Sequence, residues 1–177
     1  MDLCDFNQIK ALLSRHGFSF MKSMGQNFLI DPKIPIKIAN ASGTGPENAV
    51  LEIGPGIGSL TSELCRRAGK VTAVELDRRL LPILEETLSG SQNAEIINAD
   101  ILKTDISGLV KERFKGYRPA VCANLPYNIT SPVITALIES GCFESMTFMV
   151  QREVARRICS APGTSEYGSF TVFVIII

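Results

Sequence analysis

Residues Asn124, Leu125, Pro126 and Tyr127 place an amide, a proline and an aromatic ring directly after an apolar run. An exocyclic amine on an aromatic ring is a poor nucleophile, because its lone pair is delocalised into the ring. If the Asn124 side-chain oxygen and the Leu125 carbonyl accept its two hydrogens, the nitrogen becomes pyramidal and regains a directed lone pair. Pro126 fixes its own φ and restricts the residue before it, which aims that carbonyl. Tyr127 can stack on the base, worth about 1–3 kcal/mol. The cluster therefore suits a planar amino-purine, with a proline-stiffened strand–helix turn as the alternative.

A glycine-rich loop, with Gly54, Gly56 and Gly58, stands between the first apolar run and a helical pattern. Glycines let a ligand approach the backbone, and the free N–H groups at the start of the helix face it. Twenty-one residues after Gly54, the second apolar run ends at Glu75. A carboxylate in that position can accept hydrogen bonds from both hydroxyls of a ribose. The pair predicts a nucleoside-bearing cofactor at the carboxyl edge of a sheet, with a tight turn that binds no ligand as the alternative.

The glycine spacing bears on which cofactor this is. The dinucleotide fingerprint G-x-G-x-x-G would need a glycine where Ser59 stands. The observed pattern is E-x-G-x-G-x-G, with Glu52 inside the strand, and it favours S-adenosylmethionine over NAD because the former has no pyrophosphate. Asp100 follows the third run, where a carboxylate can accept the proton of the adenine amine. An N-cap or turn aspartate is the other interpretation.

The chemistry these groups indicate is in-line displacement of a methyl group from a sulfonium by the purine amine. A strong general base is not required, because the amine becomes acidic once it is alkylated. Positioning of the nitrogen against the methyl can supply about 7–11 kcal/mol. An adenine within structured RNA must first be splayed out of its stack, at a cost of a few kcal/mol.

The elements that must position these groups alternate along the chain. Short apolar runs typical of strands buried on both faces occupy residues 49–54, 71–76, 94–98, 120–124 and 146–151. Helical patterns lie between them, and alternation of this kind predicts a parallel α/β sheet. We expect helices to stop at Gly69 and Gly141, and one to begin with Ser131 as N-cap and Pro132 at its first position.

The last segment, residues 168–177, has the apolar, β-branched composition of a strand. An unprotected apolar strand at a chain end favours aggregation, so we expect a partner element to follow it and the native chain to continue.

Composition bounds the function. The chain has 177 residues, with 45% hydrophobic and 20% charged, which fits one soluble domain. No apolar run reaches the ~18 residues that a membrane span needs. The five cysteines form no CxxC pair, so neither a zinc site nor disulfides are expected and the thiols indicate a cytosolic protein. His16 is interpreted as a helix-end residue rather than a catalyst.

A net charge of zero argues against extended binding of nucleic acid, although local clusters matter more than the total. The candidate clusters are Arg66-Arg67, Arg78-Arg79, residues 111–118, and Arg152 with Arg156-Arg157. For each of them, a solvated helix face is the alternative.

Six segments carry a resemblance to a known family: KSMGQNFLID (22–31), LEIGPGIGSLT, VELD, NADIL, NLPYNITSPV and FMVQREVARRI (148–158). In this order and spacing the chain resembles the ribosomal RNA adenine N6,N6-dimethyltransferases, most closely the KsgA type that acts on small-subunit (16S) rRNA. The resemblance implies a class I S-adenosylmethionine-dependent methyltransferase (Rossmann-like) fold, α/β, with a mostly parallel central sheet flanked by helices. It also implies transfer of four methyls to two adjacent adenosines near the 3′ end of the rRNA. The acceptor would be a pre-30S particle, and the enzyme a cytoplasmic monomer.

The resemblance also implies roles for residues and a domain organisation. The cofactor contacts fall on Gln26, Asn27, Leu29, Gly54, Gly56, Glu75, Leu76, Asp100, Ile101 and Asn124, without a metal. The target-base pocket falls on Asn124, Leu125, Pro126 and Tyr127. Residues 1–177 would be a truncated S-adenosylmethionine-binding methyltransferase domain without the family's helical C-terminal domain that binds rRNA. The segment before Asp31-Pro32 would cover the cofactor and enter a helix with Asp31 as its N-cap.

Three alternatives stay open. One is the related dimethylase of large-subunit rRNA, of the antibiotic-resistance type. Another is a nucleotide-dependent oxidoreductase, which Ser59 and the N-L-P-Y cluster disfavour. The third is a non-catalytic role in RNA binding or ribosome assembly.

Overall fold

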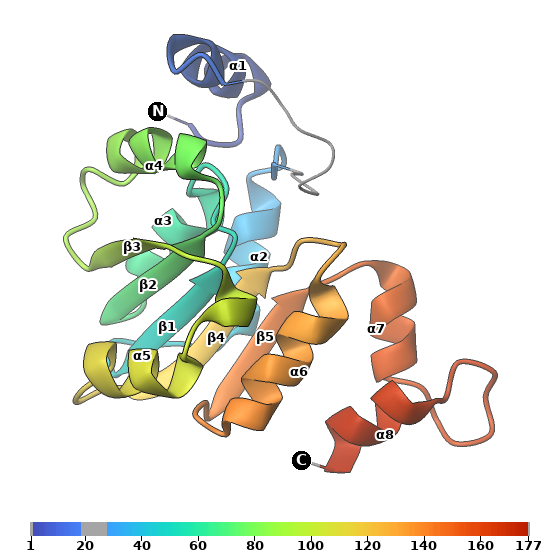
Figure 1. Cartoon of the computed structure of the whole chain (residues 1–177). Coiled ribbons are helices and arrows are strands. Elements are labelled where there is room, and N and C mark those ends of the chain that lie inside the picture. The colour runs from blue at the N-terminus through green and yellow to red at the C-terminus, as the bar shows by residue number, and fades with distance from the viewer. Residues whose placement is uncertain (1, 19–27, 177) are drawn as a thin grey trace.

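The computed structural model describes residues 2–18 and 28–176 (Figure 1). Its centre is a five-stranded sheet of order β3-β2-β1-β4-β5 in which every pairing is parallel. The strands are β1 Asn48–Ile53, β2 Lys70–Glu75, β3 Ala94–Asn98, β4 Arg118–Asn124 and β5 Ser145–Met149. The five strands and the parallel sheet predicted from the apolar runs are therefore confirmed, and no strand end is shifted by more than two residues.

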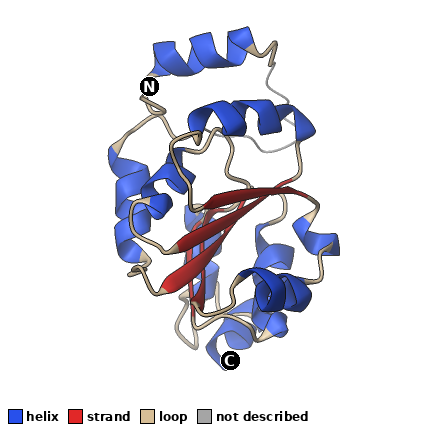
Figure 2. Cartoon of the chain, turned by 90° about the vertical axis from the view of Figure 1, so that its left-hand side faces the viewer, coloured by secondary structure: helices blue, strands red, loops and turns tan. Residues whose placement is uncertain are grey.

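Helices cover both faces of the sheet (Figures 1 and 2). The α-helices are α1 Phe6–Arg15, α2 Lys33–Ala41, α3 Ser59–Cys65, α4 Leu81–Thr87, α5 Ile106–Arg113, α6 Thr130–Ser140, α7 Arg152–Ile158 and α8 Ser169–Ile176. Two 3₁₀ turns, η2 Arg78–Leu80 and η3 Ile101–Lys103, follow β2 and β3. Within the described stretches, no helix combines the length and the apolar character that crossing a membrane needs.

The alternation of side chains along β1 explains why helices are needed on both faces. Leu51 and Ile53 belong to the core cluster that α5 and α6 complete, whereas Val50 belongs to the cluster of α2 and α3. Every residue of β1 is buried. Successive side chains of a strand point to opposite faces, so a strand whose residues are all buried requires a cover on each side.

The strand order reverses direction between β1 and β4. From β1 the chain adds β2 and β3 on one side, and it then returns to place β4 and β5 on the other. Crevices in open parallel sheets form outside the carboxyl ends of the strands at such a switch. This edge is where the candidate site residues end their strands.

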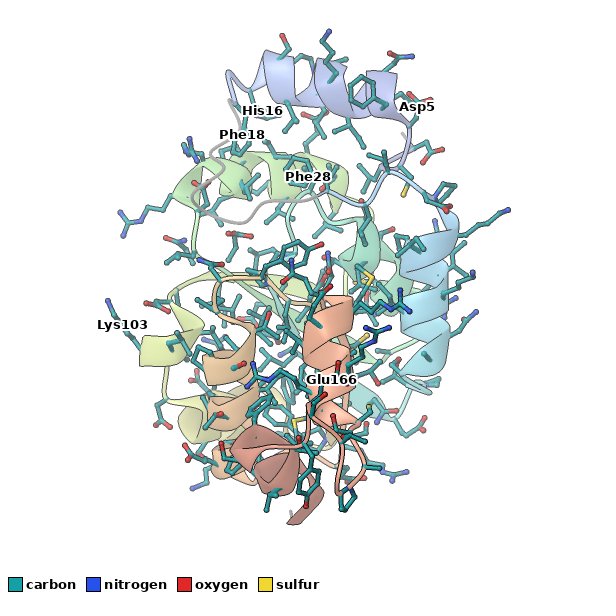
Figure 3. All side chains as sticks on the ribbon, turned by 90° about the vertical axis from the view of Figure 1, so that its right-hand side faces the viewer. Asp5, His16, Phe18, Phe28, Lys103 and Glu166 are labelled. Atoms are coloured by element: carbon teal, nitrogen blue, oxygen red, sulfur yellow. The ribbon has the colours of Figure 1, made fainter. Side chains whose placement is uncertain are left out.

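Helix α1 packs on α4 through a cluster that contains Ile9, Leu12 and Leu13. His16 is the C-cap of α1, as the sequence predicted, and its Nε2 lies 2.7 Å from Glu86 Oε2 on α4. Figure 3 shows Phe28 in the loop below α1, beneath Phe18 and His16. The helix therefore adds a layer above the carboxyl edge of the sheet.

The strand predicted for residues 168–177 is wrong, because the segment forms α8. Gly168 N–H donates to Thr171 Oγ1 (3.2 Å), which resembles half of a capping box, and Phe170 and Phe173 pack against the core cluster on the α6 side. Periodicity cannot separate a short buried helix from a strand, and here packing overrides the β-branched composition. The risk of strand aggregation inferred for this segment therefore does not apply.

The expected start of α6 is also corrected. The helix begins at Thr130 with Ile129 as its N-cap, so Ser131 and Pro132 are its second and third residues instead of cap and first position. Thr130 Oγ1 donates to the Pro126 carbonyl (2.9 Å), and this hydrogen bond fixes the first turn of the helix at Thr130. A proline is tolerated there, because the first four N–H groups of a helix have no intrahelical partner.

Other boundaries lie near their predicted places. Gly141 ends α6 in the left-handed region, at φ 61°, as expected. Helix α3 stops at Cys65, four residues before the predicted stop at Gly69. The N–H of Lys33, the first residue of α2, donates to Asp31 Oδ1 (2.9 Å), so Asp31 acts one residue ahead of the assigned N-cap.

Candidate active site

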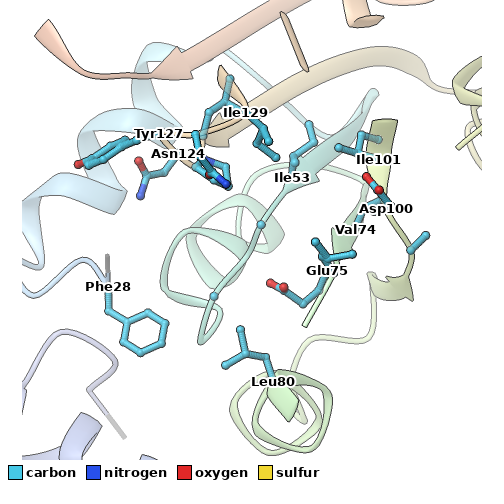
Figure 4. A pocket seen from close by; sticks show the side chains of 17 residues that line it. Phe28, Ile53, Val74, Glu75, Leu80, Asp100, Ile101, Asn124, Tyr127 and Ile129 are labelled. Carbon is cyan, nitrogen blue, oxygen red and sulfur yellow. The ribbon is translucent and has the colours of Figure 1, made fainter. Parts of the chain in front are cut away.

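A cavity of about 220 Å³ opens at the carboxyl edge of the sheet, across the ends of β1, β2 and β4 and the turn after β3 (Figure 4). The predicted site residues that line it are Gly54, Gly56, Glu75, Leu76, Asp100, Ile101, Asn124, Leu125, Pro126 and Tyr127. Parallel strands bring these residues together although they lie far apart in the sequence.

The remaining predicted residues fall elsewhere. Leu29 lines a smaller adjoining cavity of about 30 Å³, which shares Gly54, Gly56 and Asn124 with the main one. Gln26 and Asn27 lie outside the described residues.

The glycine loop runs along the cavity with two glycines in the left-handed region, Gly54 at φ 68° and Gly56 at φ 61°. A Cβ at Gly54 would lie 3.4 Å from Pro126 Cγ, and one at Gly56 would lie 3.3 Å from the Phe28 ring. Side chains at these positions would strain the backbone and narrow the cavity.

Glu75 ends β2 with only 6% of its surface exposed. Its Oε1 accepts a hydrogen bond from the N–H of Asp77 (2.8 Å), and its carboxylate points into the cavity in Figure 4. Burial raises the pKa of Glu75, while the backbone N–H groups of Asp77 and Gly56 act in the opposite direction. The carboxylate is thus held by its own chain at the cavity wall.

Asp100 has the turn role that was the alternative interpretation. It is the N-cap of η3, where its Oδ1 accepts from Leu102 N–H (3.1 Å) and its Oδ2 lies 3.6 Å from Lys103 Nζ. The residue also lines the cavity. Capping fixes the carboxylate at the cavity wall, so the two roles are compatible.

The loop after β4 is fixed at both ends. Leu125 N–H donates to the Met149 carbonyl at the end of β5 (3.1 Å), and Thr130 Oγ1, on a buried side chain, donates to the Pro126 carbonyl. Tyr127 lies at the cavity mouth with 43% of its surface exposed. A ligand in the cavity could therefore reach the Tyr127 ring without displacing other groups.

Asn124 carries the most informative unsatisfied group. Its Oδ1 is buried and has no hydrogen-bond partner in the described part of the chain, and the residue lines both cavities. A buried acceptor left without a donor costs about 1–3 kcal/mol. The arrangement is suited to an incoming N–H donor.

Among the cavity residues that the sequence analysis did not name as contacts, Phe28 and Glu52 have the clearest bearing on the site. Phe28 lines both cavities, and its only signal was its place in the G-Q-N-F-L motif. Glu52 is 1% exposed, lines the smaller cavity and has an Oε2 without a partner among the described residues. Burial raises the pKa of Glu52 to about 8. An acid within an otherwise apolar strand was the signal for it.

In residues 2–18 and 28–176, no cluster of three or more His, Cys, Asp or Glu side chains is arranged to hold a metal ion.

Comparison with known sequences gives a consistent result. A family model described as ribosomal RNA adenine dimethylase matches residues 17–177. A curated relative from Shouchella clausii is 47% identical over 173 residues, and one from Geobacillus thermodenitrificans is 48% identical over 175 residues. Both bear the name ribosomal RNA small subunit methyltransferase A. The matches cover 97% and 98% of this chain but 58% and 60% of the relatives, so the chain spans about three fifths of their length.

Solved structures agree on the fold. The 23S rRNA methyltransferase ErmE is 36% identical, with a TM-score of 0.69 over 85% of this chain and 56% of that one. A dimethyladenosine transferase from Plasmodium falciparum is 32% identical, with a TM-score of 0.70 over 82% of this chain and 51% of that one. The predicted fold, a parallel sheet flanked by helices as in S-adenosylmethionine-dependent methyltransferases, is confirmed.

Proposed function

Because the chain belongs to the ribosomal RNA adenine dimethylase family, we propose that it is the catalytic domain of an enzyme that methylates adenosine N6 in small-subunit rRNA. The observation that carries the proposal is the buried Asn124 Oδ1, which lacks a donor in the described part of the chain and lines the cavity. An adenine amine supplies such a donor. The relatives' printed names support small-subunit rRNA as the substrate.

S-adenosylmethionine fits the residues of the cavity, and it supplies a methyl carbon activated by a sulfonium. Gly54 and Gly56 leave room along the loop, Glu75 presents a carboxylate to the ribose hydroxyls, and Asp100 presents one to the adenine amine. Leu76 and Ile101 offer apolar surface for the adenine ring between these acids. Leu29, Gln26 and Asn27 complete the proposed contacts by family resemblance. The family implies this cofactor, while the individual contacts are our proposal.

In the transfer, the protein orients the acceptor nitrogen and raises its nucleophilicity. Asn124 Oδ1 and the Leu125 carbonyl accept the two N6 hydrogens, which concentrates the lone pair on the face turned to the methyl. Tyr127 stacks on the target base. The hydrogen bond from Leu125 N–H to the Met149 carbonyl holds the loop in place at the cavity. Bound S-adenosylmethionine would supply the methyl carbon, and the electron pair of the S–C bond that breaks as the N–C bond forms would remain on the departing thioether sulfur. The alkylated nitrogen then loses a proton to water. No metal is needed, because the sulfonium is already electrophilic.

The proposal extends to the remaining expectations from the sequence. We take residues 1–177 as one S-adenosylmethionine-binding methyltransferase domain that acts as a monomer in the cytoplasm, where small-subunit rRNA is presented in a pre-30S particle. The relatives' greater length supports a contribution to rRNA binding from parts outside these residues.

The test is transfer of labelled methyl groups to small-subunit particles that lack dimethyladenosine and, in parallel, to unmodified large-subunit rRNA, followed by mapping of the modified bases. The chain is assayed beside a full-length relative, and equilibrium binding of S-adenosylmethionine is measured against NAD. We expect S-adenosylmethionine binding without NAD binding, and label on two adjacent adenosines near the 3′ end of the rRNA. Label confined to large-subunit rRNA would instead identify the antibiotic-resistance type, whose structural match is ErmE. Cofactor binding without transfer by either protein would favour a role in assembly.

A further inference from the structure

The arginine side chains divide into two groups by their partners. Those outside α7 each bond to a side-chain oxygen of Asp, Glu or Asn: Arg15, Arg66, Arg67, Arg78, Arg79, Arg113 and Arg118. Those on α7 are Arg152, Arg156 and Arg157, and none of them forms an ion pair within residues 2–18 and 28–176. The difference sets the α7 arginines apart from the other arginines of the described residues.

The exposed face of α7 concentrates these cations. Arg152 and Arg156 are four residues apart, so their side chains are neighbours on one face of the helix. Both are exposed, and α7 has no buried residue. The Arg157 guanidinium lies 6.0 Å from the centre of the Phe170 ring, which directs it toward α8. The acid of α7 itself, Glu153, forms no ion pair with these arginines in the described part of the chain.

The position of α7 relates this face to the cavity. The Met149 carbonyl that holds Leu125 N–H ends β5, and α7 begins three residues later at Arg152. In Figure 1 the first turn of α7 lies beside the carboxyl end of β5, at the same edge as the loop after β4. Arg156 lies about 6 Å further along the helix axis, slightly more than one turn away from that edge. Arg152 therefore begins α7 at the edge of the sheet where the cavity opens, and Arg156 follows about one turn further from that edge.

We propose that the α7 face, Arg152 and Arg156, binds the backbone phosphates of the RNA that flank the adenosine presented to the cavity. The proposal rests on the proposed function, because it takes RNA as the substrate. Guanidinium groups match phosphate oxygens with two parallel hydrogen bonds, and surfaces that bind single-stranded RNA combine such cations with exposed aromatic rings. Tyr127 at the cavity mouth is such a ring. Because the net charge is zero, electrostatic attraction to RNA depends on local basic faces such as this one.

The test compares two double variants. Arg152→Gln with Arg156→Gln removes the two cations, and Lys111→Gln with Lys115→Gln removes two exposed cations from the end of α5 and the loop before β4, at the opposite edge of the sheet. The probe is a short labelled single-stranded RNA with two adjacent adenosines at its centre, and binding is followed by fluorescence anisotropy at a series of KCl concentrations. Each lost phosphate contact lowers the slope of log K against log salt by about 0.7 for single strands.

We expect the α7 variant to bind the RNA at least about tenfold more weakly at low salt, with a slope reduced by about 1.4. The lysine variant should keep both values, and all proteins should keep the same affinity for S-adenosylmethionine, which also verifies folding. Arg152→Lys with Arg156→Lys should keep the slope and lose part of the affinity, because the charge stays but the bidentate geometry is lost.

Two results would overturn the proposal: a slope and affinity unchanged in the α7 variant, or an equal loss in the lysine variant. A wild-type chain that binds the RNA at no salt concentration would overturn it as well. These outcomes are separate from failure of the proposed function, which is measured as methyl transfer. If the salt dependence of RNA binding depends on α7 but the protein transfers no methyl group, α7 is an RNA-binding surface and the catalytic function that we propose is wrong.

Discussion

The ends of β2 and β3 and the end of β4 face the same cavity but satisfy their polar groups differently. After β2 and β3 the carboxylates take hydrogen bonds from their own chain: Glu75 from Asp77 N–H and Asp100 from Leu102 N–H. We call this region, with both turns, the acid side. After β4, Asn124 Oδ1 has no donor within the described residues. We call this loop, with α7, the amide side.

The difference indicates how each side meets its ligand. On the acid side the chain fixes the acceptors in advance, so a ligand binds to groups that need little reorganisation. On the amide side the buried oxygen lacks a donor and the Tyr127 ring is exposed, so we expect a ligand in the cavity to donate to the oxygen and to contact the ring. An acceptor that gains its donor only from the substrate stabilises the transition state more than the ground state, so it should act on turnover rather than on binding. Mutations on the two sides should therefore separate binding from turnover.

The largest expected effect is on the amide side, from Asn124→Ala. Removal of one preorganised polar contact in an active site typically lowers kcat by about 10²–10³. We expect a loss of that size in methyl transfer to undermethylated small-subunit particles, with a much smaller change in S-adenosylmethionine affinity measured by calorimetry. Asn7→Ala, at an exposed position of α1, is the matched control and should behave as wild type. If Asn124→Ala and Asn7→Ala transfer methyl groups at equal rates, the Asn124 amide does not raise the nucleophilicity of the adenine nitrogen.

The next effect concerns Glu52, which lies on β1 between the two sides. Burial raises its pKa to about 8, from an unfolded value of 4.5. The folded state therefore binds more protons than the unfolded state between these pH values, and stability falls as pH rises through that window. The loss is on the order of a few kcal/mol, at 1.36 kcal/mol per pKa unit.

Glu52→Gln cannot titrate and should lose this pH dependence. The measurement is urea unfolding without cofactor at pH values from about 5 to about 9. The wild type should become less stable across the range relative to the variant. Parallel curves for the two proteins would mean that Glu52 ionises normally in the folded state.

On the acid side we expect a smaller effect, on binding. Glu75→Ala removes charged hydrogen bonds worth about 1.5–3 kcal/mol each, so the Kd for S-adenosylmethionine should rise by roughly tenfold to a hundredfold or more. Glu85→Ala, an exposed acid on α4, is the control and should leave the Kd unchanged. An unaltered Kd in the Glu75 variant would count against contact with the ribose, even if activity fell.

The strands and most of the residues that line the cavity on the two sides could be predicted from the sequence, because their signals are local. A loop such as Gly54 to Gly58 and an acid such as Glu75 each follow an apolar run, and parallel strands carry such ends to one edge. What the sequence missed depends on packing. The α8 segment has the composition of a strand, yet Phe170 and Phe173 meet the core as a helix. The same limit applies to single residues, since neither the burial of Glu52 nor the place of Phe28 against Gly56 can be read from spacing.

The smallest expected effect tests the loop that joins the two sides. Gly56→Ala and Gly43→Ala both place a side chain at positive φ, 61° and 62°, so each should destabilise the fold by about 1–2 kcal/mol. Only at Gly56 does the added Cβ meet another group, the Phe28 ring at 3.3 Å, whereas nothing lies within 4 Å at Gly43. We therefore expect similar losses in urea unfolding but a weaker affinity for S-adenosylmethionine in Gly56→Ala alone. Equal affinities would mean that the Phe28 ring moves aside at no cost to binding, and Phe28 would then not form a fixed wall of the cavity.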